Sequence, residues 1–370
     1  MSKNWMRHFE LQVLNDKGEG ISLSNFKVTF NIEKMPSSQF GGFVGNFRVY
    51  NLSRDTQNRI MGNEFSKIRV IAGYDGIAPD VKATEVGVAR SVNADDVGQM
   101  DDRNYGLIFN GDIRFTIKGK DNATDSWILL QCIDCWEGHL HGRVKTTVAA
   151  GWTYDDLFNL GMKSLEPFGI TRGNVPDVLH NTVFPRGCTI YSTTSKLMTE
   201  IAENCNAYFW YDNNQVNIIP KDKYIGAKAV VLNADTGLIG MPQQTMGGGV
   251  NVRCLINPNI KLGGLIRIDQ ASVYRAALGN GDVAMANGRI SERNQDGVLV
   301  VDTPQRPKMI DTDIAYAGPG VDADGYYFVG MINYTGDTRG QAWYMDLLCL
   351  AKGNMSPMSR TNLDKLHAEQ

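Results

Sequence analysis

A repeated eight-residue segment constrains this chain more than any other feature of its sequence. Residues 109–116 read FNGDIRFT and residues 328–335 read FVGMINYT, so aromatic, glycine and isoleucine positions recur at the same spacing. Apolar and polar residues alternate in both copies, which is the period of a β-strand with one buried face. A glycine between two inward-facing residues marks a bend or bulge. The repeat therefore predicts two related β units.

The match extends beyond one strand on each side. Each copy continues through a polar loop to a tryptophan and a cysteine, and two upstream segments correspond in the same order. These are Trp127 with Cys132 and Trp343 with Cys349 downstream, then 47–52 with 250–255 and 68–70 with 266–268 upstream. Strands of any β protein alternate in this way, so the alternative interpretation is that the two segments match by coincidence of composition. The repeated order favours duplication.

We predict a mainly β chain, α+β overall, in which two related tube-like β-barrel domains are separated by a small α+β domain. In the middle region a capping-box pattern at Thr153 and Asp156 begins one helix, Pro167 limits it, and a second helix begins near Thr194. The predicted domains are 1–138 (first β-barrel, with a projecting loop at 74–104), 139–228 (α+β), 229–351 (second β-barrel) and 352–370 (C-terminal tail).

Four residues of the repeat are predicted structural anchors. Gly111 and Gly330 would curve the two sheets at one place, and Trp127 and Trp343 would both be buried where each long hairpin meets its sheet. Truncating either tryptophan would then cost about 3 to 5 kcal/mol.

Composition excludes some classes of protein. Thirty-seven basic and 40 acidic residues give a net charge of −3, which provides no whole-chain footprint for nucleic acid or an anionic membrane. No apolar run approaches the roughly 18 to 20 residues that cross a bilayer. Six cysteines spread over 370 residues read as reduced, buried thiols. We expect no membrane insertion.

A zinc site is the first candidate cofactor site. Cys132, Cys135, His139 and His141 are residue types that bind zinc. Two cysteines three apart on an extended strand point to opposite faces, however, so we expect a structural role and no metal.

The remaining motifs are weaker. Residues 279–284 fit the letters of a dinucleotide fingerprint but lack its strand–turn–helix context, so we expect a turn and no cofactor. The acidic pairs 95–96 and 101–102 lack the spacing of a calcium loop, and residues 322–325 read as a hairpin turn. No nucleophile elbow or assembled catalytic group is present in the pattern. We predict that the chain is not an enzyme.

Both β regions resemble phage tail baseplate hub proteins. The resemblance is carried by 250–269 (VNVRCLINPNIKLGGLIRID), 330–350 (GMINYTGDTRGQAWYMDLLCL), 26–34 (FKVTFNIEK) and 45–60 (GNFRVYNLSRDTQNRI). Hubs of this family are similar in fold to the head of type VI secretion spike proteins. The resemblance implies a homotrimer, whose six barrels form a pseudo-sixfold ring that joins the sixfold tail tube to the threefold central spike.

Further expectations follow from this resemblance. The implied partners are the tail tube protein, the central spike protein, the tape measure protein and other baseplate components. DNA would pass through the lumen during ejection without tight binding. The implied location is the virion baseplate, after synthesis and assembly in the host cytoplasm. The repeat agrees with this hypothesis, because two copies of one unit per chain convert threefold symmetry into six similar surfaces.

Two polar hairpin loops are the candidate assembly interfaces. They contain Lys118, Lys120 and Asp121 in the first unit and Asp337, Thr338, Arg339 and Gln341 in the second. The alternative function is a carbohydrate- or cell-wall-binding module of a tail tip or secretion device. It is motivated by the aromatic run 208–211 (YFWY), because stacked aromatic rings bind sugars; a buried strand is the simpler interpretation of that run.

Overall fold

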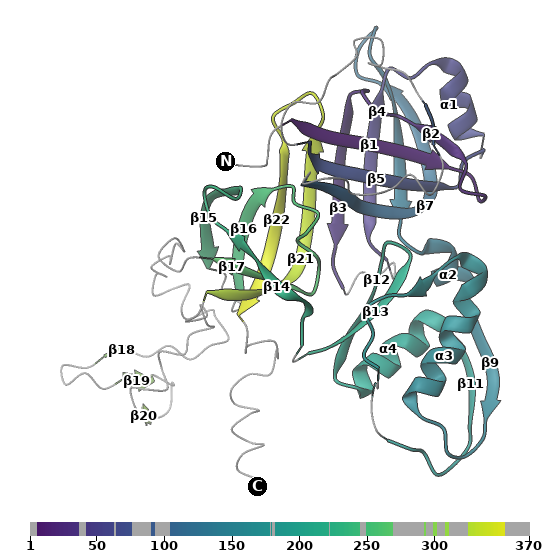
Figure 1. Ribbon diagram of the computed structural model, residues 1–370, viewed down its shortest axis with the longest axis vertical. Helices are drawn as coiled ribbons and strands as arrows, with labels where there is room; N and C mark the ends of the chain where they lie inside the picture. The colour runs from purple at the N-terminus through teal and green to yellow at the C-terminus, as the bar shows by residue number, and fades with distance from the viewer. Residues whose placement is uncertain are drawn as a thin grey trace.

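The computed structural model describes residues 6–36, 42–62, 64–75, 90–92, 104–177, 179, 182–221, 223–244, 249–268, 292–293, 299–301, 308–310 and 325–351. This part of the chain is mainly β, as predicted, and most of its strands belong to one large, largely antiparallel sheet (Figure 1). The helices other than α1 gather with two short sheets below it. The projecting loop and tail predicted at 74–104 and 352–370 lie almost wholly outside the described residues, as do 279–284, the acidic pairs and 322–324.

The large sheet contains 14 strands. They are β1 (Arg7–Leu14), β2 (Gly20–Ser22), β3 (Val28–Lys34), β4 (Val44–Tyr50), β5 (Lys67–Tyr74), β6 (Arg90–Val92), β7 (Asn104–Lys120), β8 (Ser126–Ile133), β14 (Ile225–Leu232), β15 (Leu238–Gln244), β16 (Gly249–Leu255), β17 (Gly264–Ile268), β21 (Tyr326–Asp337) and β22 (Trp343–Ala351). A separate small sheet contains β18 (Glu292–Arg293), β19 (Leu299–Val301) and β20 (Lys308–Ile310).

The strand order repeats. In the first unit β4 pairs with β8, β8 with β7, and β7 with β5. In the second unit β16 pairs with β22, β22 with β21, and β21 with β17. Each unit also adds one more strand beside its first, β3 beside β4 and β15 beside β16. The order of elements read from the sequence repeat is therefore present in the hydrogen-bonded sheet.

The register of the repeat differs from the sequence match by three residues. Gly111 pairs with Ile68, whereas the corresponding Ile266 pairs with Tyr327. A bulge interrupts the β7–β8 pairing at Arg114 and the β21–β22 pairing at Gly330. In the paired strands Gly330 therefore occupies the position of Arg114. Gly111 lies against the Ile133 carbonyl, and a Cβ added at Gly111 would lie 2.8 Å from that carbonyl oxygen. The sequence match aligned residues of the same type, whereas the backbone pairing shows which positions of the two units are structurally equivalent.

The two β units form one continuous sheet. Six residues of β21, Ile332–Asp337, pair antiparallel with Thr29–Lys34 of β3, about 300 positions earlier in the chain. Among the described residues neither unit closes on itself, since no pairing joins β1 to β3 or β14 to β15. One main hydrophobic core contains residues from both units. The predicted domain boundaries remain predictions.

The two tryptophans lie on opposite faces of their hairpins. Trp343 is 2% exposed and packs edge-on against Phe9 and Phe30. Trp127 is only partly buried, because it occupies the alternate position of its strand, where the side chain points away from the core. Its ring covers Gly119, the residue opposite it in the pairing. The expectation that both tryptophans are buried was wrong for Trp127.

The middle region has its own hydrophobic core. It consists of α2 (Trp136–His141), β9 (Arg143–Val148), α3 (Tyr154–Leu165), a 3-10 turn (Glu166–Phe168), β10 (Thr171–Arg172), β11 (Cys188–Thr193), α4 (Thr194–Asn204), β12 (Ala207–Asp212) and β13 (Gln215–Pro220). The capping box of α3 is confirmed, with Thr153 and Asp156 bonded reciprocally. Ser53 likewise caps α1 (Arg54–Met61) in the first unit.

Substitution of the two tryptophans tests the difference between the faces. Trp343→Ala removes a buried ring, and we expect it to lower the free energy of unfolding by about 3 to 5 kcal/mol. Trp127→Ala, the matched control, should cost roughly 1 kcal/mol because its ring is partly exposed. Chemical denaturation of both variants measures the two losses. Equal losses would contradict the assignment of opposite faces.

Candidate functional site

Eight strands of the large sheet share one solvent-exposed face, here called the polar face, which also carries the exposed apolar side chains of Phe115 and Ile117. In order they are β15, β16, β22, β21, β3, β4, β8 and the second half of β7. Along β3, for example, Val28, Phe30 and Ile32 are buried in the core, while Thr29 and Asn31 point to the other face. The same alternation holds along β4 and β8. The core side chains therefore define a second, water-accessible surface made of the alternate residues.

A row of polar side chains crosses this face from strand to strand. Asn31 pairs with Asn46, and Asn46 pairs with Gln131. The Gln131 amide donates to Asn46 Oδ1 at 3.2 Å, and the Asn31 amide donates to Asn333 Oδ1 at 2.9 Å. Cross-strand hydrogen bonds of this kind hold neutral amides in fixed positions. The sequence analysis did not select these amides, although strict alternation places them opposite the buried positions.

Charges on the same face largely cancel. Arg253 makes a two-pronged ion pair with Asp346 of the neighbouring strand, at 2.7 and 3.1 Å. Arg48 covers the Trp127 ring at 4.4 Å and lies 3.9 Å from the carboxylate of Asp121. An anionic polymer passing over such a surface would meet few unpaired cations.

The candidate interface loop of the second unit lies against the first unit of the same chain. The Thr338 hydroxyl accepts from Val28 N–H and donates to the Phe26 carbonyl, both at 2.9 Å. The Arg339 guanidinium donates to the Asn25 carbonyl at 2.8 Å. Arg7 in turn donates to three carbonyls of this loop, those of Asp337, Gly340 and Gln341. Within one chain this loop is therefore already in contact with the first unit.

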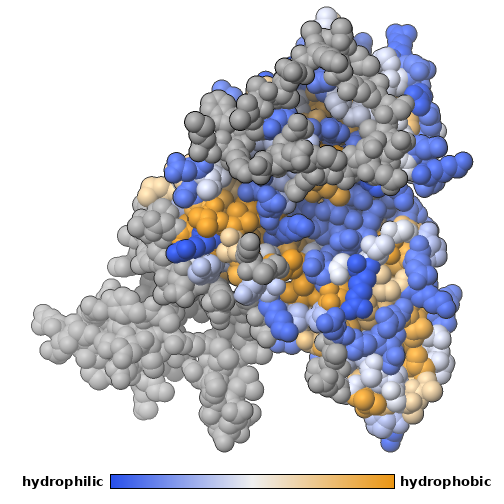
Figure 2. All heavy atoms as spheres, viewed as in Figure 1, coloured by the Kyte–Doolittle hydropathy of each residue, from blue (hydrophilic) through white to orange (hydrophobic). Residues whose placement is uncertain are grey.

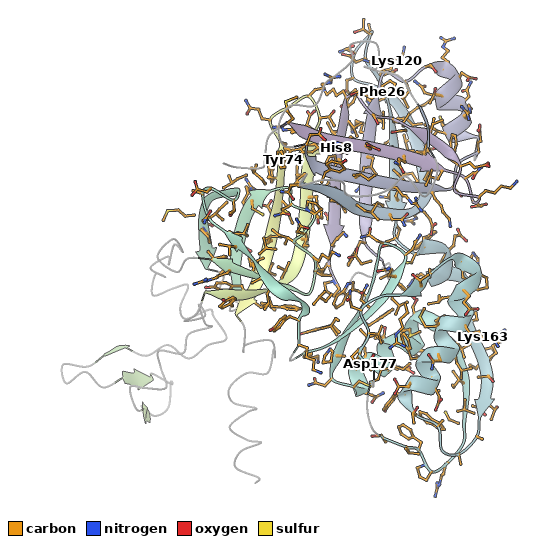
Figure 3. The ribbon with its side chains drawn as sticks, in the orientation of Figure 1. His8, Phe26, Tyr74, Lys120, Lys163 and Asp177 are labelled. Carbon is orange, nitrogen blue, oxygen red and sulfur yellow. The ribbon has the colours of Figure 1, made fainter. Side chains whose placement is uncertain are left out.

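The corresponding loop of the first unit makes its hydrogen bonds locally. Lys118, Lys120 and Asp121 are all exposed, and Figure 3 shows Lys120 near the tip of the β7–β8 hairpin. Asp121 accepts a hydrogen bond from Trp127 Nε1 at 2.8 Å, and Asn122 organises the turn by accepting from Asp125 N–H at 2.7 Å. The loop of the second unit therefore bonds to the other unit of the chain, whereas the loop of the first unit is held by hydrogen bonds within its own hairpin.

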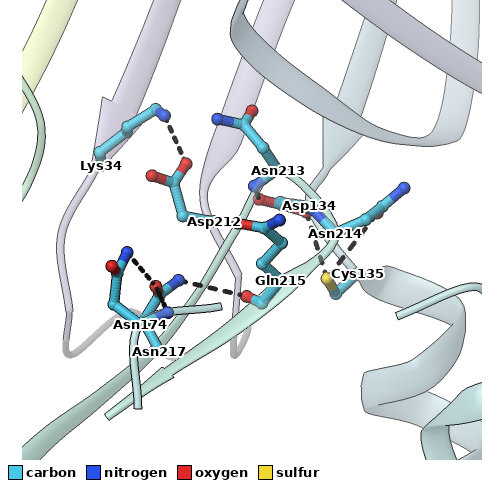
Figure 4. A network of polar contacts seen from close by, with 9 residues as sticks. All are labelled: Lys34, Asp134, Cys135, Asn174, Asp212, Asn213, Asn214, Gln215 and Asn217. Atoms are coloured by element: carbon cyan, nitrogen blue, oxygen red, sulfur yellow. Dashed lines mark hydrogen bonds and ion pairs between the residues drawn. The ribbon is translucent and has the colours of Figure 1, made fainter. Parts of the chain in front are cut away.

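A second polar group joins the middle region to the sheet (Figure 4). Asn213 and Asn214 form the two-residue turn between β12 and β13, and both have the positive φ that a hairpin turn of this length favours. Their backbone N–H groups donate to the carboxylate of Asp134, which follows β8. Beside them, Lys34 at the end of β3 binds Asp212 with Nζ to Oδ1 at 2.6 Å. The turn is therefore held at the ends of two sheet strands.

Burial changes the titration of this junction. Asp134 is completely enclosed, and loss of solvation, with the nearby charge of Asp212, raises its pKa to about 7. The backbone donor of Asn214 and the Lys34 charge act in the opposite direction. The carboxyl is thus partly protonated near neutral pH.

The sequence candidates for zinc lie in different surroundings. Cys132 belongs to the main core and Cys135 to the core of the middle region. His139 contacts the Ser195 hydroxyl at 2.9 Å, and burial together with the Arg143 charge lowers its pKa. Among the residues that the structure describes, no three His, Cys, Asp or Glu side chains gather as a metal site requires. All six cysteines are free thiols, and Cys188 and Cys205 are only partly buried.

The aromatic run 208–211 is largely occupied with packing. Trp210 and Tyr211 are buried, and they belong to the main core and the middle core respectively. This arrangement agrees with the buried-strand interpretation. In the described part of the chain no helix is long and apolar enough to cross a membrane.

The fold is thus a large sheet in which one strand order occurs twice, with a small α+β region joined to it. Residues 178–278 match the family model described as Baseplate hub gp41. This match covers little more than a quarter of the chain, and it confirms the resemblance to phage tail baseplate hub proteins. It supports a structural role in a tail baseplate. No curated protein matches the sequence.

Several solved structures are similar over most of the chain. The 43 kDa tail protein of prophage MuSo2 from Shewanella oneidensis has 9% identity and a TM-score of 0.45, covering 94% of this chain and 99% of its own. A tail protein of Neisseria meningitidis has 9% identity and a TM-score of 0.48, covering 94% and 98%. A type VI secretion component of E. coli has 6% identity and a TM-score of 0.44, covering 93% and 77%.

The titration of Asp134 predicts a pH dependence of stability. The folded pKa of about 7 exceeds the ordinary value of 3.8, so the folded chain binds more protons than the unfolded chain in this window. The free energy of unfolding therefore falls as pH rises from 3.8 to about 7, and this group adds no further change above that. Asp134→Asn removes the ionisation and keeps the shape, although only one of the two oxygens that accept from Asn213 and Asn214 remains. Denaturation of both proteins between about pH 5 and pH 8 should show a steeper fall in the unsubstituted chain, and parallel pH profiles would contradict it.

Proposed function

We propose that this chain is the structural hub of a phage tail baseplate. Three copies form a pseudo-sixfold ring that joins the sixfold tail tube to the threefold central spike and lets DNA pass during ejection. The observation that carries the proposal is the repeated strand order of the two units, joined edge to edge by β21 and β3. Three such chains present six similar units around one axis. The predicted tube-like barrels would then be completed in the assembly rather than within one chain.

The polar sheet face is the proposed lining of the lumen. Its amides are hydrogen-bonded to one another and its main ion pair is bidentate. A lining of this kind has no concentration of positive charge. DNA would therefore slide past without tight binding, because phosphate affinity depends on the number of cations that face the backbone.

The proposed partners are the tail tube protein on one side of the ring, and the central spike protein, tape measure protein and other baseplate components elsewhere. The chain would be part of the virion, made and assembled in the host cytoplasm. A hub of this kind acts through its geometry, so the proposal includes no enzymatic activity, cofactor or metal. A glycan-binding module is less well supported, because Trp210 and Tyr211 of its aromatic run are buried.

The oligomeric state is the direct test of the ring. We expect sedimentation of the purified chain at micromolar concentration to give three times the 40.9 kDa of one chain. A chain that stays monomeric would contradict the ring, and retention on purified peptidoglycan by such a monomer would favour the glycan-binding alternative instead.

Added charge tests the lining. The unsubstituted trimer should not retain duplex DNA at about 150 mM salt. Asn46→Lys with Gln131→Lys adds two cations per chain to the polar face, so the ring should gain DNA affinity that falls steeply with salt. Asn159→Lys with Asn204→Lys adds the same charge to exposed positions of α3 and α4. Equal DNA binding by the two double variants would count against the polar face as the lumen.

A further inference from the structure

A groove of about 530 Å³ opens on the middle region, between α3 and the end of β9. One wall is the segment 148–152, and the other consists of Asp156, Asn159, Leu160 and Lys163 of α3. Figure 3 shows Lys163 on the outer side of the middle region, away from the large sheet. Sites that hold a ligand in other proteins have volumes of roughly 300 to 1,000 Å³, so this groove has room for one.

The two walls differ in chemistry. The four residues of α3 follow the spacing of one helix face, and all but Leu160 are exposed. The opposite wall contributes the small and apolar residues 148–151, followed by Trp152. Figure 2 shows apolar and polar residues next to one another over this region of the molecule. The groove is therefore apolar between the walls and polar along the helix.

The backbone edge of β9 beside this groove has no partner. β9 pairs with β11 on one side, and no strand among the described residues pairs with its other side. The hydrogen bond from Thr194 N–H to the Gly142 carbonyl fixes the phase of the pairing, because antiparallel partners bond at every second residue. Lys145 and Thr147 therefore direct their N–H and C=O groups away from β11. An edge with free backbone groups is a template for an added strand.

The groove opens on this same free side. The other side of the segment 148–152 is covered, because Gly151 N–H donates to the Phe184 carbonyl and Phe184 N–H donates to the Trp152 carbonyl. None of the described residues 182–193, which include β11, lines the groove. The free edge and the groove are thus one continuous feature, with α3 alongside it.

The charges along this edge are positive. Arg143 and Lys145 are exposed on β9, and Lys163 is exposed at the groove. None of the three forms an ion pair with a carboxylate of the described residues; Arg143 bonds to the Gly142 carbonyl, and Lys145 lies 5.0 Å from the centre of the Tyr191 ring. Unpaired cations attract carboxylates, and they repel the same edge of a second copy of this chain. The charge therefore favours an acidic partner.

The two faces of β9 determine which side chains a partner strand needs. Arg143 and Lys145 lie on the exposed face, whereas Val144 is buried and Val148 is partly buried on the face that packs on the helices. A strand added beside β9 continues both faces, since side chains alternate along it and contact their cross-strand neighbours. Acidic residues would lie beside the cations, and the residues between them would lie beside the apolar wall.

We infer that the free edge of β9 and the adjacent groove bind an extended acidic segment of another protein by strand addition. In that segment acidic and apolar residues alternate, and its backbone supplies the hydrogen bonds that the edge lacks. Tyr191, 79% exposed beside Lys145, is the aromatic contact on the exposed face. This inference goes beyond the proposed hub and does not depend on the ring.

Selection from a peptide library tests the partner chemistry. The immobilised full chain is incubated with a random library of peptides about ten residues long, enough to span β9 and the groove. We expect the retained peptides to alternate acidic and apolar residues. Methylating the alternate backbone nitrogens that face β9 should abolish binding, because those N–H groups bond to the edge. Methylation of the intervening nitrogens should have little effect.

Substitutions at one position test the edge. Thr147→Pro removes an outward N–H, a change that edge strands tolerate, and it should lower the affinity for a selected peptide about tenfold or more. Thr147→Val keeps that N–H and removes only the hydroxyl contact with Thr189, so it should bind as the unsubstituted chain does.

Reversal of charge tests the cations. Arg143→Glu with Lys145→Glu should also lower the affinity about tenfold, and the loss should shrink at high salt. Lys17→Glu with Lys223→Glu makes the same change in net charge at exposed positions away from β9, and it should leave binding unchanged.

Each other outcome counts against the inference. A library that yields no retained peptide, or peptides without the alternation of acidic and apolar residues, would overturn the assigned partner. Selected peptides that bind equally well after methylation of either set of nitrogens would overturn strand addition, whether or not Thr147→Pro folds. The sedimentation of the chain is measured separately, so a failure of the ring and a failure of this site are distinguishable.

Discussion

The backbone pairing of β21 with β3 is the contact on which the remaining architecture depends. It joins segments about 300 residues apart and converts two β units into one sheet. Closing so long a loop costs conformational entropy, which local side-chain contacts must offset. Two side-chain contacts do so: Thr338 bonds to Val28 and Phe26 at one end of the joint, and the Asn31 amide donates to Asn333 within it. The polar face is continuous only because this joint keeps the two alternation patterns in phase.

The hairpin of β12 and β13 makes the middle region part of the same mechanical unit. Its Trp210 and Ile219 pack in the main core, while Tyr211 and Val216 pack in the core of the middle region. Asp134 then bonds to the turn of that hairpin. An element buried on both faces cannot rotate without opening one core or the other, so the middle region is held in one orientation relative to the sheet.

Local signals in the sequence predicted the elements but not their long-range pairing. Thr153 was recognised as a cap because a capping hydrogen bond spans three residues, and β7 and β21 were recognised from alternation. The joint of β21 with β3 leaves no local trace, because either strand would alternate in the same way beside any partner. The three-residue shift between Gly111 and Gly330 has the same cause: similarity of residue type gives no information about which carbonyl accepts which N–H. The polar amides could have been found by taking the residues between the buried ones.

Duplication of a unit allows its copies to diverge, and the equivalent strands show how. Ile332 and Tyr334 of β21 are buried, whereas the equivalent positions on β7 are Thr116 and Lys118, which are more exposed. On this face the long strand is thus apolar in β21, where β3 covers its edge, and polar in β7, where no strand of the described residues pairs with 115–120 on the side away from β8. A free edge that were equally apolar would favour indiscriminate aggregation before assembly.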